Sequence, residues 1–132
     1  MMQPSANKAY VFNEHVNVQY LNNLYSGDYE MIEETFSDVL AEFPSLLENI
    51  DAAALTRDLP GLKQAIHKIK PLFGFTGLTA IQTGCQDFEN ACVSHPSFDS
   101  ILPIFSILNK SIVRAQAIIA EEKARLAIFN SR

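Results

Sequence analysis

Apolar residues recur at alternating steps of four and three along four long stretches of the chain, a spacing typical of one face of an α-helix packed in a bundle. The four stripes comprise Ile32, Phe36, Val39, Phe43, Leu46, Ile50 and Ala53; Leu62, Ile66, Ile69 and Phe73; Leu78, Ile81, Cys85, Phe88 and Cys92; and Ile101, Phe105, Leu108, Ile112, Ala115 and Ile119. No stretch shows the strict alternation of a β-strand. The pattern predicts an all-α protein, an antiparallel up-down four-helix bundle in which short connections join neighbouring helices.

A short helix is predicted ahead of the bundle, over residues 18–26, where it would cap one end. Asn17 is its candidate N-cap, and Gly27 is a candidate for the residue that follows its end. Asp28 can cap the first long helix. Short polar side chains at these positions accept hydrogen bonds from backbone N–H groups that a helix start leaves without partners.

The second long helix is predicted to start at a cap formed by Asp58 or Leu59. Two prolines lie inside predicted helices, Pro44 in the first and Pro71 in the second. Each removes one backbone hydrogen bond, so we expect a bend at each proline.

The sequence predicts two parts of the chain, which meet at residue 16. Residues 1–15 show no sustained period and are expected to form a loosely ordered arm, and residues 16–132 a single helical domain. Residues 94–100 are predicted to be a loop, and the last helix is expected to fray beyond Arg125 as its sequence turns polar.

Composition sets limits on the class of protein. A chain of 132 residues with 48% apolar residues suits one globular domain. Its formal charge of −5 argues against nucleic acid as a partner. We see neither a signal peptide nor a stretch of about 20 apolar residues that would span a membrane. Cys85 and Cys92 would lie about 10 Å apart on one helix face, too far to form a disulfide. We therefore expect a cytoplasmic monomer with reduced cysteines.

One histidine lies on the polar side of its helix. His67 is roughly 130° around the helix from the stripe that ends at Phe73. The residues around it on this outer surface are Lys63, Gln64, Lys70, Pro71 and Gly74. A histidine in this position is not needed to fill the core, and the neighbouring lysines favour an anion.

The segment around His67 resembles the signature of histidine-containing phosphotransfer (HPt) domains. The residues that carry the resemblance are His67, Lys70, Pro71 and Gly77, followed in the next helix by Leu78, Ile81, Cys85, Phe88 and Glu89. The resemblance extends over residues 17–125 and implies a helical module that relays phosphoryl groups between response-regulator receivers. It implies no cofactor of its own, because the Mg²⁺ used in the transfer would come with the partner receiver.

The resemblance also implies roles for individual residues. His67 would accept the phosphoryl group, and Lys70 would neutralise its charge. Glu89 takes a position that in some members is a Gln that helps to hold the histidine ring, and Gln86 could serve instead. The alternative for Glu89 and Gln86 is that each is a plain solvent-facing residue. The alternative for His67 is a surface histidine without function.

The remaining candidates concern partner docking. Lys63 and Lys68 would make the rim basic and favour encounter with an acidic receiver pocket. Pro71 and Gly74 remove bulk, so that a partner could reach the histidine, and Gly77 either belongs to this signature or simply ends the helix. Leu72 and Phe73 stand where the family usually has small residues. This departure leaves open which receivers the protein would select, but not the transfer chemistry.

The function implied is therefore that of a phosphotransfer protein without an ATP-binding or autokinase site, with receiver domains and hybrid histidine kinases as partners. One alternative is a bundle that binds a receiver or kinase as an inhibitor or scaffold without transferring phosphoryl groups. Another is the phosphoacceptor domain of a kinase, separated from its catalytic part. No metal site is expected, because His15 and His95 lie in predicted loops without ligand spacing.

Overall fold

Five helices account for most of the chain. The computed structural model describes residues 10–95 and 97–132, and within them every regular element is helical. The elements are α1 (Val18–Tyr25), α2 (Tyr29–Leu55), α3 (Leu59–Phe75), α4 (Thr79–Ser94) and α5 (Phe98–Asn130). The prediction of an all-α fold with four substantial helices and a short leading one is confirmed.

Side-chain caps begin most of these helices. The carboxylate of Asp28 accepts a hydrogen bond from the backbone N–H of Met31 at 3.0 Å, and Asn17 and Asp58 do the same for α1 and α3. Each cap pairs an N–H that the first turn cannot satisfy internally, so it fixes where the helix begins. The predicted caps at these three positions are confirmed.

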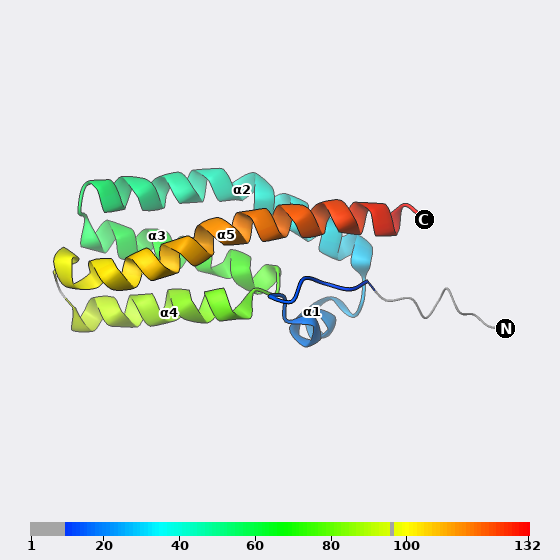
Figure 1. Cartoon of the computed structure of the whole chain (residues 1–132), viewed down its shortest axis with the longest axis horizontal. Coiled ribbons are helices and arrows are strands. Elements are labelled where there is room, and N and C mark those ends of the chain that lie inside the picture. Colours follow the sequence, from blue (N-terminus) through cyan, green and yellow to red (C-terminus); the bar gives the residue numbers. More distant parts are fainter. Residues whose placement is uncertain (1–9, 96) are drawn as a thin grey trace.

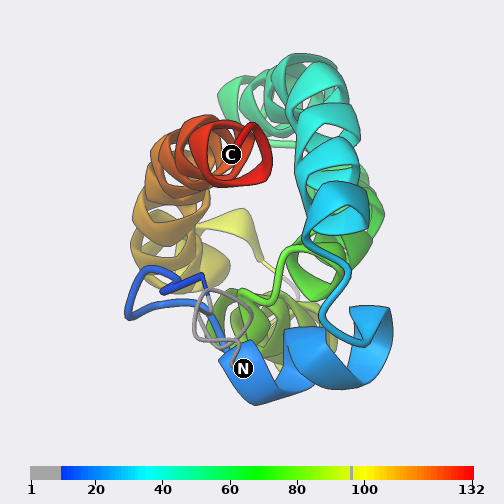
Figure 2. The same ribbon diagram turned by 90° about the vertical axis from the view of Figure 1, so that its right-hand side faces the viewer.

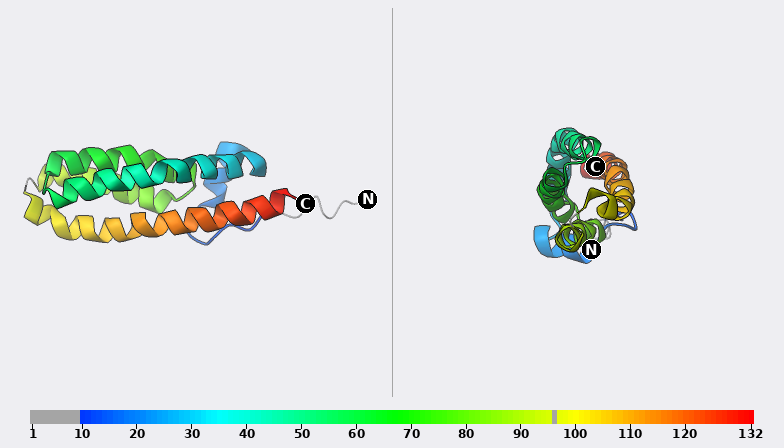
Figure 3. Two further views of the ribbon diagram at one scale, coloured as in Figure 1. Left: turned by 90° about the horizontal axis from the view of Figure 1, so that it is seen from above. Right: turned by 90° about the vertical axis from the view of Figure 1, so that its left-hand side faces the viewer.

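The four long helices lie side by side along one axis, and α1 lies across one end (Figures 1 and 2). Viewed along that axis, they surround a common interior, in which α2 and α4 each contact both α3 and α5 (Figure 3). All the predicted stripe residues are buried except Leu46 and Ile81, which are half-buried against the core. The fully buried phenylalanines at the centre are Phe36, Phe43, Phe73 and Phe88.

Two predictions at the ends of α5 are wrong. The connection between α4 and α5 is shorter than the predicted loop 94–100, because the Ser97 hydroxyl accepts a hydrogen bond from the Ser100 N–H and starts α5 at Phe98. At its other end α5 does not fray at Arg125 but continues to Asn130. Buried Leu126 and the half-buried Phe129 give these last turns a core to pack on.

Residues 10–16 pack against the bundle instead of forming a loose arm. Tyr10, Phe12 and Val16 are buried, whereas Val11 is exposed. Aromatic rings hold this segment, since Tyr10 lies in edge contact with Phe129, with ring centroids 5.6 Å apart. Residues 1–9 of the predicted arm lie outside the described residues.

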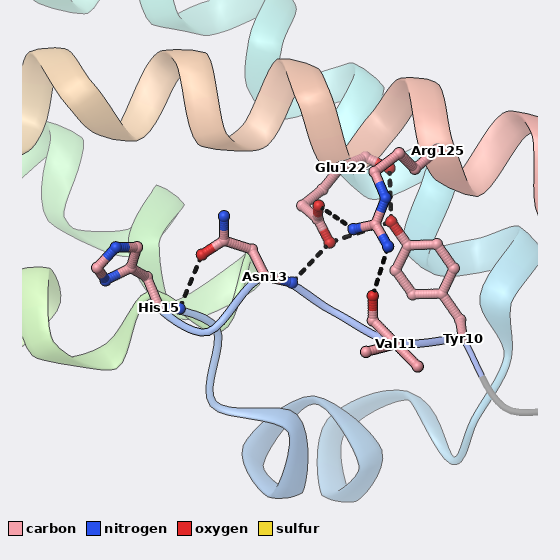
Figure 4. A network of polar contacts seen from close by, with 6 residues as sticks. All are labelled: Tyr10, Val11, Asn13, His15, Glu122 and Arg125. Carbon is pink, nitrogen blue, oxygen red and sulfur yellow. Dashed lines mark hydrogen bonds and ion pairs between the residues drawn. The ribbon is translucent and has the colours of Figure 1, made fainter.

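A buried carboxylate joins this segment to α5 (Figure 4). Fully buried Glu122 accepts hydrogen bonds from the Tyr10 hydroxyl and the Asn13 backbone N–H, both at 3.0 Å, and pairs with Arg125 at 2.6 Å. Arg125 also donates to the Val11 carbonyl at 2.8 Å. We call these contacts the Glu122 network. They satisfy a charge that would otherwise be costly to bury.

Helix α5 is long and apolar enough to cross a membrane by length and composition, and 28% of its most apolar window is buried in the bundle. The core helix of a bundle passes the same test, so this finding does not conflict with the expectation from the sequence. The residues that α5 buries in the core are Ile101, Phe105, Leu108, Ile112, Ala115, Ile119, Glu122 and Leu126.

Both cysteines are free and buried, as the sequence predicted. Burial raises the pKa of the Cys85 thiol to about 12, and the negative charge of Glu89 adds to the effect. A thiol in this environment stays protonated and unreactive at neutral pH.

Candidate functional site

His67 projects from the surface of α3 on the side that faces α4. Leu62, Ile66 and Ile69 bury the opposite face of the helix, which fixes its rotation and directs His67 outward. The imidazole is 57% exposed, and its Nδ1 lies 2.9 Å from Oε1 of Glu89 on α4. The ring is thus both accessible to a partner and held at one nitrogen.

The same glutamate binds Lys70, one turn along α3 from His67. Lys70 Nζ donates to Oε2 of Glu89 at 2.7 Å and to Oε1 of Gln86 at 2.8 Å. Glu89 therefore uses one oxygen for the histidine and the other for the lysine. Its side chain is only 11% exposed and that of Lys70 is 18% exposed, so this pair lies beneath the more open imidazole.

The charges of this cluster stabilise one another. Burial alone would raise the pKa of Glu89, but hydrogen bonds from Lys70 and His67, with the positive charge of Lys70, outweigh it and hold the pKa below its ordinary value. Glu89 is therefore a carboxylate at neutral pH. A carboxylate accepts hydrogen bonds only, so the proton between it and the imidazole is carried by Nδ1.

The turn between α3 and α4 sets the register that brings these residues together. Gly77 has a φ of 72°, which a glycine adopts readily, and its carbonyl accepts a hydrogen bond from the Asn17 N–H at 2.8 Å. A Cβ at this position would lie 2.8 Å from Cγ of Leu21. Gly77 is therefore needed to end α3 and return the chain as α4, in line with the helix-end interpretation.

The other candidates do not all share this surface. Gln64 and Lys68 line a separate hollow of about 410 Å³ between α2 and α3. Pro71 is exposed near the histidine, while Lys63 is half-buried. Gly74 is buried instead of lying on the outer surface, because the Gln82 side chain lies over it, and a Cβ there would be 2.7 Å from Gln82 Nε2.

The sequence interpretation missed Asn90 on α4, and it placed Gln82 at the edge of the docking face without the contact that Gln82 makes over Gly74. The Asn90 side chain accepts a hydrogen bond from Gln86 Nε2 at 3.1 Å and so orients the amide that binds Lys70. The solvent-facing interpretation of Glu89 is not what the structure shows, and Gln86 contacts the lysine and not the ring. Positions 82, 86 and 89 recur at helical spacing, which was the available signal.

Within the part of the chain that the structure describes, no group of three or more His, Cys, Asp or Glu side chains is arranged to hold a metal ion. A family model described as Hpt domain matches residues 34–118, which includes all of α3 and α4. The chain belongs to the Hpt domain family. No curated protein and no solved structure matches the chain.

Membership of the Hpt family gives the cluster a context. Hpt domains have a phosphotransfer role in two-component signalling and are phosphocarrier modules, not kinases or ATP-binding enzymes. They interact in general with receiver domains and histidine kinases, and they are generally cytoplasmic proteins. The His67 surface lies within the matched residues.

Proposed function

We propose that His67 accepts a phosphoryl group from the aspartate of one receiver domain and passes it to the aspartate of another. The observation that carries this proposal is an exposed imidazole held at Nδ1 by Glu89. A surface histidine without function would not require a largely buried carboxylate oriented toward it. Family membership supports the class of chemistry, and the geometry supports this residue.

The hydrogen bond to Glu89 makes Nε2 the nucleophile. With the proton on Nδ1, the lone pair of the neutral imidazole resides on Nε2. In the forward step the Nε2–P bond forms as the bond between phosphorus and the aspartate oxygen breaks, and the aspartate leaves as a carboxylate. The imidazole becomes positively charged, and the Glu89 carboxylate stabilises that charge. The reverse sequence loads the second receiver.

Lys70 is placed to neutralise the phosphoryl oxygens without leaving its present partners. An ammonium group has three N–H donors, and Glu89 and Gln86 occupy two of them. The third can bind a phosphoryl oxygen on the neighbouring imidazole. Phosphoryl transfer depends chiefly on positioning and charge neutralisation, and these contacts supply both.

The docking face that we propose is the outer surface of α3 around His67 together with α4 from Gln82 to Glu89. A receiver, or the receiver of a hybrid histidine kinase, would bring its acidic cluster and Mg²⁺ to this face. We also infer the antiparallel up-down order of α2–α5, because consecutive helices contact one another and are joined by connections of only three residues. A cytoplasmic carrier fits this scheme.

The test is transfer of label from a panel of phosphorylated receivers to the protein. We expect label that is labile in acid and stable in alkali, the behaviour of a phosphoimidazole. His67→Gln should abolish it, and His15→Gln, which changes another exposed histidine, should leave it intact. Nitrogen chemical shifts of the labelled protein should place the phosphorus on Nε2.

Two outcomes would contradict the proposal. Equal labelling of the wild type and His67→Gln would place the phosphoryl group elsewhere. Binding of receivers without label on either protein would instead support the alternative of an inhibitor or scaffold.

A further inference from the structure

A groove follows the junction of α4 and α5, on the side of α4 away from Glu89. Its larger part is a hollow of about 350 Å³ between Gly84 and Ile107. It continues into a smaller hollow of about 200 Å³, and both are lined by Ala80, Ile81 and Ser111. The two hollows therefore form one continuous surface.

The groove is apolar and carries one charge of each sign. Ile107 projects from its larger part and is 72% exposed, far more than a core helix requires. Asp87 borders the same part, and Arg114 borders the smaller hollow. Among the described residues neither Asp87 nor Arg114 takes part in an ion pair. Both charges are therefore available to a partner.

We propose that this groove binds a second copy of the chain in a two-fold symmetric dimer. A two-fold axis perpendicular to the groove makes the grooves of the two copies run in opposite directions. The larger hollow of each copy then faces the smaller hollow of the other. Asp87 of each copy then faces Arg114 of the other. Ile107 of each copy enters the smaller hollow of the other, which has an apolar lining from Leu78 and Ile118.

Charge complementarity is what selects a second copy as the occupant. The chain carries 15 acidic and 10 basic residues, so two copies repel over most of their surfaces. This groove is different because Asp87 and Arg114 give it no net charge. The two-fold symmetry places each of them opposite the residue of opposite charge in the other copy. Between them, small Ala80 and Ser111 allow the two surfaces to approach closely.

The dimer goes beyond the proposed phosphotransfer function and leaves its site open. Gln86 and Glu89 lie on the side of α4 that faces α3, whereas Gly84 and Asp87 lie on the side that faces α5. Each copy would therefore present its own His67 to solvent. This replaces the monomer expected from the sequence.

The experiment is sedimentation equilibrium of the full chain over a wide range of concentrations, combined with a charge exchange. The wild type should show a reversible monomer–dimer equilibrium. Asp87→Arg and Arg114→Asp should each weaken the dimer by about tenfold or more, since each places like charges opposite one another. The double variant should restore dimerisation, because the pair is re-formed with its signs exchanged.

Apolar variants provide a second test that does not depend on charge. Ile107→Lys should abolish the dimer, while Leu55→Lys, at a residue that is 86% exposed and outside the groove, should have no effect. Circular dichroism would show that these surface variants fold. A wild type that remains monomeric at about 1 mM, or a dimer that the double exchange does not rescue, would overturn the proposal. Transfer assays on His67 would be unaffected by either result.

Discussion

Glu89 and Lys70 should be energetically coupled, and the coupling should disappear in acid. Their side chains are 2.7 Å apart and are 11% and 18% exposed. Hydrogen bonds to charged groups contribute about 1.5–3 kcal/mol, and partial exposure places this pair toward the lower end of that range. We expect a coupling free energy of about 1–2 kcal/mol at pH 7.

The sign of the pH dependence follows from the lowered pKa of Glu89. Burial opposes that lowering, but the bonds from Lys70 and His67 outweigh it. A carboxyl with a lower pKa in the folded state stabilises the fold at pH values above its unfolded value of about 4.3. This contribution is lost as the pH falls through the folded value. The coupling should therefore be constant near neutrality and decrease in acid.

The assay is a double-mutant cycle of Glu89→Gln and Lys70→Met, with the free energy of unfolding measured in urea from pH 7 downward. The exposed pair Arg57–Asp99, with side chains 54% and 81% exposed, is the control and should couple by less than about 0.5 kcal/mol. A Glu89–Lys70 coupling below about 0.3 kcal/mol at pH 7, or one that does not change in acid, would refute this account of the site.

Four further predictions follow from single contacts. Lys70→Gln should slow phosphoryl transfer by about 10²-fold in single-turnover assays, with labelling of the histidine still detectable. Gly77→Ala should lower the free energy of unfolding by about 2–3 kcal/mol and Gly27→Ala by about 1 kcal/mol, because both residues have positive φ but only the first is crowded. Glu122→Ala should cost about 3 kcal/mol in urea denaturation. Iodoacetamide should modify Cys85 only after denaturation, because its raised pKa and burial suppress the thiolate; fast alkylation of the native protein would contradict this.

The helices could be predicted from the sequence because each has a continuous apolar stripe. The predicted positions on α3 are fully buried, and the same rotation that buries Ile66 and Ile69 exposes His67. Local capping by Asp28 and Asp58 also follows from residue type alone. These features depend on spacing within one helix, so they need no knowledge of the neighbouring helices.

The end of α5 was mispredicted because a charged residue occupies a core position. Ile119, Glu122, Leu126 and Phe129 continue the stripe at steps of three, four and three, and a glutamate there looks like the end of the apolar face. Its carboxylate is satisfied by Tyr10 and Asn13, which lie more than 100 positions earlier in the chain. Helical periodicity in α5 carries no information about such distant partners.

Of the two contacts of Glu89, the one with the His67 ring was a candidate from the family resemblance, whereas the one with Lys70 was not predicted. Periodicity predicted that Glu89 lies on the exposed side of α4. It did not predict how α4 is rotated and how far it is shifted along its axis relative to α3. Those depend on the turn at Gly77 and on its contact with Asn17. The sequence identified position 89 as one that could hold the histidine ring. That His67 and Lys70 share one carboxylate is seen only in the three-dimensional structure.

The Glu122 network also has a consequence for the order of folding. The Asn13 amide meets Glu122 across 109 positions of the chain, so closing this contact before the helices assemble would cost a large loop entropy. We expect it to form after the transition state, when α5 is already in place. Contacts that form late affect the unfolding rate more than the folding rate. Weakening this network should therefore shorten the lifetime of the folded protein while leaving its rate of formation nearly unchanged.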